Sequence, residues 1–395
     1  MSIAETSGEL DVGYVEEASW GVLPGSPQFI SLRNTGVNFG PDFSAKSSEA
    51  EVVKDGQVSD VTVQQKSSKG SVPFLLSFGE YDTHFEHLMR SAFTTIQTIT
   101  GVDLSLSGSQ LLSTANAFTS ANNAVGQHII IAGSATQAND GVYEITAFAV
   151  GALDLKKLDG TTAAFTADSS NASLKYASSK MLRNGTTKKS MAFELGNTGI
   201  AQFLLYKGNR VADFSLALAD DSEISGTFNF QGKKLETPTQ VTNSTGPLTA
   251  SQTGKIMNAN SHIANILEGG ADVTSFWRNI SLSINNNLSE ATAVKNEGSV
   301  EVFYGNFKVS GSVEIYFEDV ALLTKLLNKT ATSLRVSLKD DDGNYFIFTV
   351  LNCKFTGFDQ GALAANQPIA ATLTFDGAKD TTTGKTFQVD MLAKL

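Results

Sequence analysis

A strand pattern that occurs twice is the feature that most constrains the fold of this 395-residue chain. The stretch SEAEVVKDGQVSDVTVQQKSSKGSV begins at Ser48, and SEATAVKNEGSVEVFYGNFKVSGSV begins at Ser289, at an offset of 241 residues. Nine of the twenty-five positions are identical without a gap. Farther along, eight of eighteen positions match between the stretches that begin at Ala217 and Ala362. Because the two matches keep their order, we interpret the chain as a duplicated unit.

The offset between matching residues falls from 241 to 145 along the repeat, so the first copy holds 96 residues that the second lacks. The additional residues fall at about 94–189. Short apolar stretches alternate there with turn signals such as Asn139-Asp140-Gly141 and Asp159-Gly160. This pattern predicts a small β domain inserted into the first copy.

Each copy follows the same coarse plan of strands and one helix. In the second copy Ile280, Leu282 and Ile284 alternate with serines, which is typical of a half-buried strand. One helical face is formed in each copy by an apolar set: Phe85, Leu88, Met89, Ala92 and Phe93 in the first, and Val320, Leu323, Leu326 and Leu327 in the second. The sequence therefore predicts a mainly β protein with two tandem β-sandwich or partial-barrel units, each with one packed helix, plus the inserted β domain.

These patterns divide the chain into six segments. They are an N-terminal arm (1–24), a first unit (25–93 with 190–236), the inserted β domain (94–189), a linker (237–275), a second unit (276–380) and a C-terminal tail (381–395). If the units are equivalent, Gly70 superposes on Gly311, Phe230 on Phe375 and Gly232 on Gly377.

Charge and composition exclude several classes of protein. The formal net charge of −11 argues against a nucleic-acid groove binder, because such proteins neutralise phosphates with clustered Lys and Arg. The first ten residues, MSIAETSGEL, lack the basic and apolar regions of a secretory signal. No apolar run approaches the roughly 20 residues of a membrane span. Cys353 is the only cysteine, so we expect a core residue and no disulfide.

Two histidines on the first helix are the strongest candidate metal ligands. His84 and His87 lie three residues apart, with Asp82 and Glu86 nearby. The same acidic residues also suit the start of a helix, where they interact favourably with the helix dipole. We favour this second interpretation and predict no metal site.

Other motifs fail on their spacing. The stretch DDDGN at 340–344 lacks acidic residues at the first and last positions of a calcium loop, so a tight turn explains it better. The stretch TTTGKT at 381–386 lacks the upstream glycine of a phosphate loop, because position 379 is Lys. No GxSxG surrounds any serine, and the chain has four His in all. We predict no catalytic residue, no cofactor and no enzyme activity.

Several stretches resemble the major tail tube protein of long, non-contractile (siphovirus-type) bacteriophage tails. They are YVEEASWGVLPGSPQFISLRN from Tyr14, RNISLSINNNLSEA from Arg278, the long loop ahead of GSVEVFYG, and the single helix before a hairpin. The simplest members of that family carry one unit per chain. This chain is similar to a duplicated form with an inserted β domain.

The resemblance implies a structural subunit that polymerises as stacked rings around a channel for viral DNA. Its expected partners are its own copies, the tape measure protein, tail-tip and terminator proteins, and passing double-stranded DNA that it does not bind specifically. No membrane partner is expected. The expected location is the virion tail, after assembly in the host bacterial cytoplasm.

The loops at 47–59 and 289–299 are similar to the long loop by which one ring contacts the next. The candidate ring-stacking residues are Glu49, Glu51, Lys54 and Asp55 in the first copy, and Glu290, Lys295 and Glu297 in the second. Their mixed charges suit the setting of axial register. The alternative is a solvated, charged hairpin loop without a role in assembly.

Three further expectations concern the ring. Family members with one unit close as hexamers, so three duplicated chains should form a pseudo-sixfold ring. The acidic balance of the chain predicts a channel of net negative potential, and the inserted domain should project outward and be dispensable for assembly. The alternative function is a surface-exposed binding module for carbohydrate or a cell-surface ligand, carried mainly by the inserted domain. Such modules expose aromatic clusters, and the chain has only Trp20 and Trp277.

Overall fold

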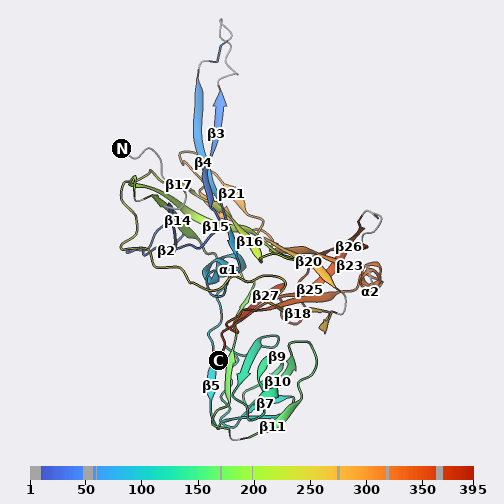
Figure 1. Cartoon of the computed structure of the whole chain (residues 1–395). Coiled ribbons are helices and arrows are strands. Elements are labelled where there is room, and N and C mark those ends of the chain that lie inside the picture. Colours follow the sequence, from blue (N-terminus) through green and yellow to red (C-terminus); the bar gives the residue numbers. More distant parts are fainter. Residues whose placement is uncertain are drawn as a thin grey trace.

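The computed structural model describes residues 10–47, 57–58, 60–169, 171–197, 199–273, 276–316, 320–361 and 368–395. It is mainly β, with two α-helices among the described residues. Figure 1 shows a central body, a long hairpin that projects from one end, and a separate curled sheet at the other end. The predicted class of β-sandwich or partial-barrel units with packed helices is confirmed.

We name the two halves of the body copy one and copy two. Copy one contains the helix α1 (Asp82–Met89) and the strands β1 (Leu10–Glu16), β2 (Ile30–Ser31), β3 (Asn38–Ser47), β4 (Val61–Leu75), β14 (Met191–Asn197), β15 (Gln202–Ala219), β16 (Ser225–Gly232) and β17 (Lys234–Leu235). Copy two contains the helix α2 (Ala321–Leu327) and the strands β18 (Ile263–Glu268), β19 (Ala271–Asp272), β20 (Trp277–Asn285), β21 (Ser289–Ala291), β22 (Glu301–Phe303), β23 (Lys308–Tyr316), β24 (Thr332–Lys339), β25 (Tyr345–Gln360), β26 (Ala370–Gly377) and β27 (Phe387–Leu392).

Strand pairing agrees with the repeat residue by residue. Gly70 of β4 pairs with Phe230 of β16, and the residues at offsets 241 and 145, Gly311 of β23 and Phe375 of β26, pair with each other. The bulges recur as well: β15 shifts register between Val211 and Asp213, and β25 shifts between Phe355 and Gly357. Equal register and equal bulges are what a duplicated unit produces.

A neighbouring aromatic ring leaves no room for a side chain at Gly70 or at Gly311. A Cβ on Gly70 would lie 2.2 Å from the ring of Phe39, and one on Gly311 would lie 2.5 Å from the ring of Phe375. A side chain at either position would collide with a core aromatic ring. The aromatic core therefore demands glycine in both copies.

One sheet runs through both copies. The second half of β15 pairs antiparallel with β20, from Asp213 opposite Asn285 to Ala219 opposite Asn279. The resulting order is β3-β4-β16-β15-β20-β23-β26-β25. The copies are thus joined as neighbours within a sheet.

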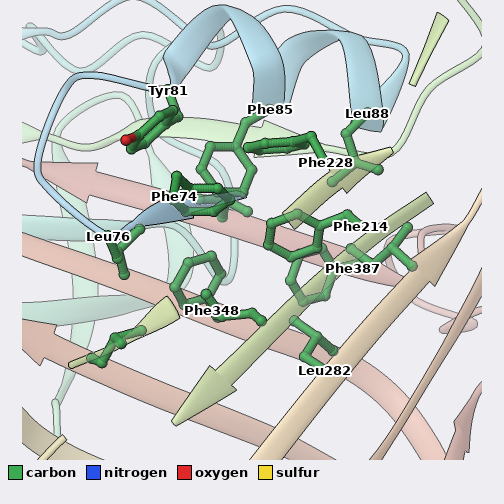
Figure 2. Packing of buried hydrophobic residues seen from close by; sticks show 14 of the residues in the cluster. Phe74, Leu76, Tyr81, Phe85, Leu88, Phe214, Phe228, Leu282, Phe348 and Phe387 are labelled. Carbon is green, nitrogen blue, oxygen red and sulfur yellow. The ribbon is translucent and has the colours of Figure 1, made fainter. Parts of the chain in front are cut away.

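An aromatic core lies beneath this sheet, and α1 packs on it (Figure 2). The ring of Phe85 lies 5.5 Å from Phe214 and 5.4 Å from Phe228 of copy one, and 5.5 Å from Phe346 of copy two. Cys353 is fully buried in the same core, and burial raises the pKa of its thiol to about 12. The prediction that Cys353 is a core residue is confirmed.

The inserted residues form an eight-stranded sheet with its own apolar core. Its strands are β5 (Thr98–Thr100), β6 (Leu104–Gly108), β7 (Gln110–Ser113), β8 (His128–Ala132), β9 (Gly141–Ala149), β10 (Ala152–Lys157), β11 (Phe165–Asp168) and β12 (Lys175–Ser178), with a 3₁₀ turn, η2 (Gln137–Asn139). The next strand, β13 (Lys180–Arg183), pairs with β27 of copy two. The return from the insert therefore crosses to the other copy.

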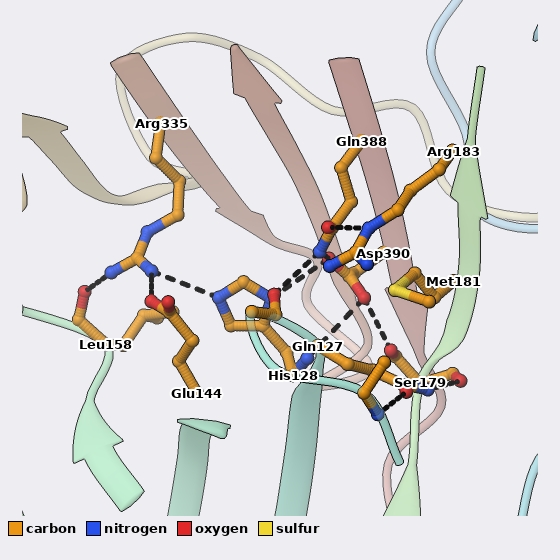
Figure 3. A network of polar contacts seen from close by, with 12 residues as sticks. Gln127, His128, Glu144, Leu158, Ser179, Met181, Arg183, Arg335, Gln388 and Asp390 are labelled. Atoms are coloured by element: carbon orange, nitrogen blue, oxygen red, sulfur yellow. Dashed lines mark hydrogen bonds and ion pairs between the residues drawn. The ribbon is translucent and has the colours of Figure 1, made fainter. Parts of the chain in front are cut away.

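A buried polar network attaches the inserted sheet to copy two (Figure 3). Arg335 of β24 donates to Nε2 of His128 at 3.1 Å, to the Leu158 carbonyl at 2.5 Å and to the Glu144 carboxylate. Asp390 of β27 accepts from Nδ1 of His128 at 3.0 Å. Because arginine has only donors, His128 accepts at Nε2 and carries its proton on Nδ1. This network fixes the insert against copy two.

Two segments expected outside the units contribute strands to the body. The segment 237–275 contains β18 and β19, and β18 pairs with β24. The segment 381–395 contains β27, which is buried along its whole length and pairs with β25.

Candidate assembly surfaces

The outer face of the shared sheet is polar. In β20 Ser281, Ser283 and Asn285 are exposed, whereas Ile280, Leu282 and Ile284 are buried on the other face. The hydroxyls of Ser281 and Ser312 lie 2.7 Å apart across β20 and β23. This face is hollowed over β3, β4, β15 and β16, with a volume of about 590 Å³. Strand alternation thus gives both copies one continuous polar surface.

Charges on this face occur mostly as opposite pairs. Lys69 lies 2.9 Å from Asp42, Arg278 lies 2.9 Å from Glu314, and Lys308 lies 3.3 Å from Asp376. Strand alternation places Asp213, Asp359 and Lys354 on the same face. The exposed or half-buried charged side chains placed on this face in this way are Asp42, Asp213, Glu314, Asp359, Asp376, Lys69, Arg278, Lys308 and Lys354. Arg210, opposite Gln231, projects from the same face but is buried against Glu301.

Both ends of the shared sheet have open edges. Within the described ranges, β3 pairs only with β4, and the end of β25 from Gly357 to Gln360 pairs only with β26. An open edge presents unpaired backbone N–H and C=O groups to another strand. The shared sheet therefore has, within the described residues, a free edge strand in each copy.

The hairpin of β3 and β4, which we call the arm, projects beyond the body (Figure 1). Phe43, Val61 and Val63 are 57%, 54% and 60% exposed. Val61 pairs with Ser47 and Val63 with Ala45, so the three apolar side chains share one face of the arm. A solvent-exposed apolar face on a two-stranded hairpin is typical of a contact surface.

The sequence-predicted loop residues are described in the second copy. Glu49, Glu51, Lys54 and Asp55 lie outside the described residues. In copy two, Glu290 is half-buried and accepts a hydrogen bond from Gln231 of copy one, whereas Lys295 and Glu297 are exposed.

The copy-two loop packs against copy one within the chain. Arg210 of β15 lies 2.7 Å from Glu301 and also donates to the Val302 carbonyl. Tyr304 donates from its hydroxyl to the Lys189 carbonyl at 3.0 Å. The guanidinium of Arg210 also lies over the Tyr304 ring, 5.2 Å from its centroid. Sequence reasoning missed Arg210 and Tyr304, since nothing in the local pattern links residues so far apart.

The two helical histidines are core residues. His84 and His87 are fully buried, and the ring of His84 lies 4.6 Å from that of Tyr14. The described residues contain no group of three or more His, Cys, Asp or Glu side chains placed to hold a metal ion. Burial lowers the pKa of His84 to about 3, with a smaller contribution from His87.

This buried histidine predicts acid sensitivity. Below pH 6.5 the unfolded chain binds a proton at residue 84 that the folded chain excludes, so stability falls as pH decreases from 6.5 towards 3. The loss amounts to at most about 1.4 kcal/mol per pH unit from this group. His84→Leu should flatten the dependence in urea unfolding between pH 6.5 and 4.5, relative to pH 8. Equal slopes for the variant and the parent chain would contradict this assignment.

Neither tryptophan lies in the inserted sheet. Trp20 donates its indole N–H to the Gly208 carbonyl at 2.9 Å, and Trp277 is part of β20. The exposed aromatic clusters expected of a carbohydrate-binding insert therefore gain no support from tryptophan. No helix among the described residues has the length and apolar character required to cross a bilayer.

Comparison with known families gives a match over most of the chain. A family model described as phage tail tube protein matches residues 10–377. No curated protein matches the chain.

Proposed function

Since the chain belongs to the phage tail tube protein family, we propose that it polymerises as stacked rings around a channel that conducts viral DNA into the host. Family membership makes it a structural component of the virion tail, with a non-enzymatic role. In this proposal the rings assemble in the host cytoplasm around the tape measure protein. Tail-tip and terminator proteins lie at the ends of the tube in this proposal.

The observation that carries the proposal is the shared sheet with one open edge at each end. β15 of copy one pairs with β20 of copy two within the chain. We propose that the equivalent strands, β25 of one chain and β3 of the next, pair in the same way and close the ring. By the repeat, Gly357 of one chain pairs with Asp42 of the next, and Gln360 pairs with Phe39. Pro41 on β3 removes one backbone bond from this ladder, and proline is accepted on edge strands. Closure removes both open edges.

The polar outer face of the shared sheet is the proposed channel wall. Its serine, threonine and asparagine side chains offer no apolar surface to which a nucleic acid base could adhere. Its basic side chains are mostly paired with carboxylates. A wall without free clusters of Lys and Arg releases few counterions from DNA, so the duplex slides.

The proposed ring also gives each segment of the chain a place. We propose that the units 25–93 with 190–236 and 276–380 each occupy one of six ring positions, and that the linker 237–275 spans neighbouring units. The insert 94–189 lies outside the channel. The arm, with Glu49, Glu51, Lys54 and Asp55 near its end in sequence, reaches the adjacent ring. The loop with Glu290, Lys295 and Glu297 supports the arm from copy two.

Electron microscopy of the purified chain tests the proposal. We expect rings or striated tubes whose layers contain three chains with pseudo-sixfold symmetry, with β20 and β23 at the channel wall. Six chains in a layer would contradict the proposed use of the duplication. Monodisperse particles, formed even when tail-tip complexes are supplied as nuclei, would contradict the tube itself.

A further inference from the structure

The two helices occupy equivalent places but differ in burial. On α1, Phe85, Leu88 and Met89 are fully buried. On α2 no residue is buried, and Val320 and Leu327 beside and within it are 58% and 72% exposed. By the repeat of the apolar pattern, Leu327 corresponds to Met89. An apolar helix face that is fully covered in one copy is therefore only partly covered in the other, where Leu322 and Leu326 are half-buried and Leu327 is exposed.

Copy two covers the end of α1. Asn286 donates from Nδ2 to the Leu88 carbonyl at 3.0 Å. The guanidinium of Arg90, directly after α1, lies 5.3 Å from the ring centroid of Tyr304 and 5.6 Å from that of Phe307. Val302 in the same segment is fully buried. The segment 286–307 of copy two thus closes over the helix of copy one.

The equivalent segment of copy one is the base of the arm. Val302 and Tyr304 correspond to Val61 and Val63 at the offset of 241. Asn286 directly follows β20 and corresponds to Phe43. The correspondence follows from the pairing, because Asn285 stands opposite Lys308 and Asp42 stands opposite Ser67, which is the equivalent of Lys308 at the offset of 241. These three arm residues are more than half exposed. Both halves of the contact thus recur in the chain, and both are exposed where they recur.

An ion pair between the copies also has counterparts at equivalent positions. Arg210 and Glu301 lie 2.7 Å apart across the contact between the copies. Their counterparts by the repeat are Lys354 and Asp60, which keep the two charges and are exposed. A charge pair of the same polarity therefore recurs at the corresponding positions.

From this geometry we propose that the base of the arm of one chain packs on α2 of the preceding chain in the ring, with Asp60 facing Lys354. The inference rests on the proposed ring and names its partner, a second copy of this chain. The contact is heterologous, because the arm of one chain meets the helix of another. It reproduces between chains the contact within the chain in which Asn286 bonds to Leu88 of α1, Tyr304 lies under Arg90 directly after α1, and Val302 is buried in the same segment.

Charged substitutions at exposed apolar positions test the contact. We expect Leu327→Asp and Val61→Asp each to reduce sedimentable rings at least about tenfold, because each places an unpaired charge in a buried contact. Val102→Asp, in an insert residue that is 64% exposed, is the matched control. Thermal melting of the three unassembled variants should stay close to the parent value.

A mixture separates this geometry from general loss of assembly. Leu327→Asp chains keep an intact arm and Val61→Asp chains keep an intact helix face, so an equal mixture should form heterodimers and stop there. Either variant alone should remain monomeric in analytical ultracentrifugation. Assembly of both variants at the parent level would overturn the inference while leaving the proposed tube intact.

A charge exchange gives an independent readout. Lys354→Glu and Asp60→Lys should each weaken assembly, and the double variant should recover most of it, because the pair is restored with reversed polarity. Lack of recovery in the double variant would overturn the assignment of this pair. If the parent chain itself forms neither rings nor tubes under the conditions above, the proposed function fails and these variants show no difference from it.

Discussion

Replacing Arg335 by Met is expected to lower the free energy of unfolding by about 1–3 kcal/mol for each buried acceptor that loses its donor, namely Nε2 of His128 and the Leu158 carbonyl. Glu144 keeps an ion pair with Lys156 at 3.1 Å. The Arg335 side chain is 6% exposed and lies among His128, Glu144 and the Leu158 carbonyl. Methionine keeps most of the aliphatic packing, so the loss reports mainly on polar contacts. Urea unfolding at pH 7.5 measures it.

Arg278→Met is the matched control for this experiment. Arg278 is 35% exposed and pairs with Glu314 at 2.9 Å. Exposed ion pairs of this kind contribute at most about 1 kcal/mol. A loss for Arg335→Met no larger than that for Arg278→Met would show that the network contributes no more than a surface pair.

The network also affects how a deletion of the insert must be designed. Deleting residues 94–189 removes His128, Glu144 and Ser179, which are partners of Arg335 and Asp390. The deletion therefore removes the side-chain and carbonyl groups to which Arg335 donates, and leaves Asp390 with Gln388 of the same strand. A test of whether the insert is dispensable for assembly needs Arg335 and Asp390 replaced by apolar or neutral residues in the same variant.

The equivalence of positions between the two copies is the part of the fold that the sequence predicts best. The offsets of 241 and 145 relate the pair Val72–Phe228 to the pair Val313–Leu373, and the structure contains both pairs. The alternation of Ile280, Leu282 and Ile284 with serines identifies the buried face of β20. Both signals are local and periodic, so a single sequence is enough to show them.

The packing of the copy-two loop on copy one could not be predicted in this way. The matching residues Ser289 and Ser48 begin loops of similar composition, yet the copy-two loop packs on Arg210 and Lys189 of copy one. That contact depends on the neighbour that the sheet places beside each loop. Copy one lies beside copy two within the chain, whereas the free edge of copy one has no neighbour within the described part of the chain. The repeat in the sequence does not show which copy has a neighbour in the sheet.

The core between the copies predicts the other large effect. Phe85→Ala should lower the free energy of unfolding by about 3–5 kcal/mol, as removal of a fully buried phenylalanine ring leaves a cavity. The ring contacts Phe214 and Phe228 of copy one and Phe346 of copy two. Leu323→Ala in α2 is the matched variant. It should cost less than about 2 kcal/mol in the unassembled chain, because that residue is half-buried.

Two probes show whether the copies unfold together. Fluorescence of Trp20, in a Trp277→Phe background, follows copy one, and labelling of the buried Cys353 thiol follows copy two. Because Phe85 contacts rings from both copies, Phe85→Ala should shift both transitions to lower urea by the same amount. A shift of the Trp20 transition alone would mean that the shared sheet does not couple the copies. The junction of β15 with β20 would then be too weak to serve as the pattern for contacts between chains.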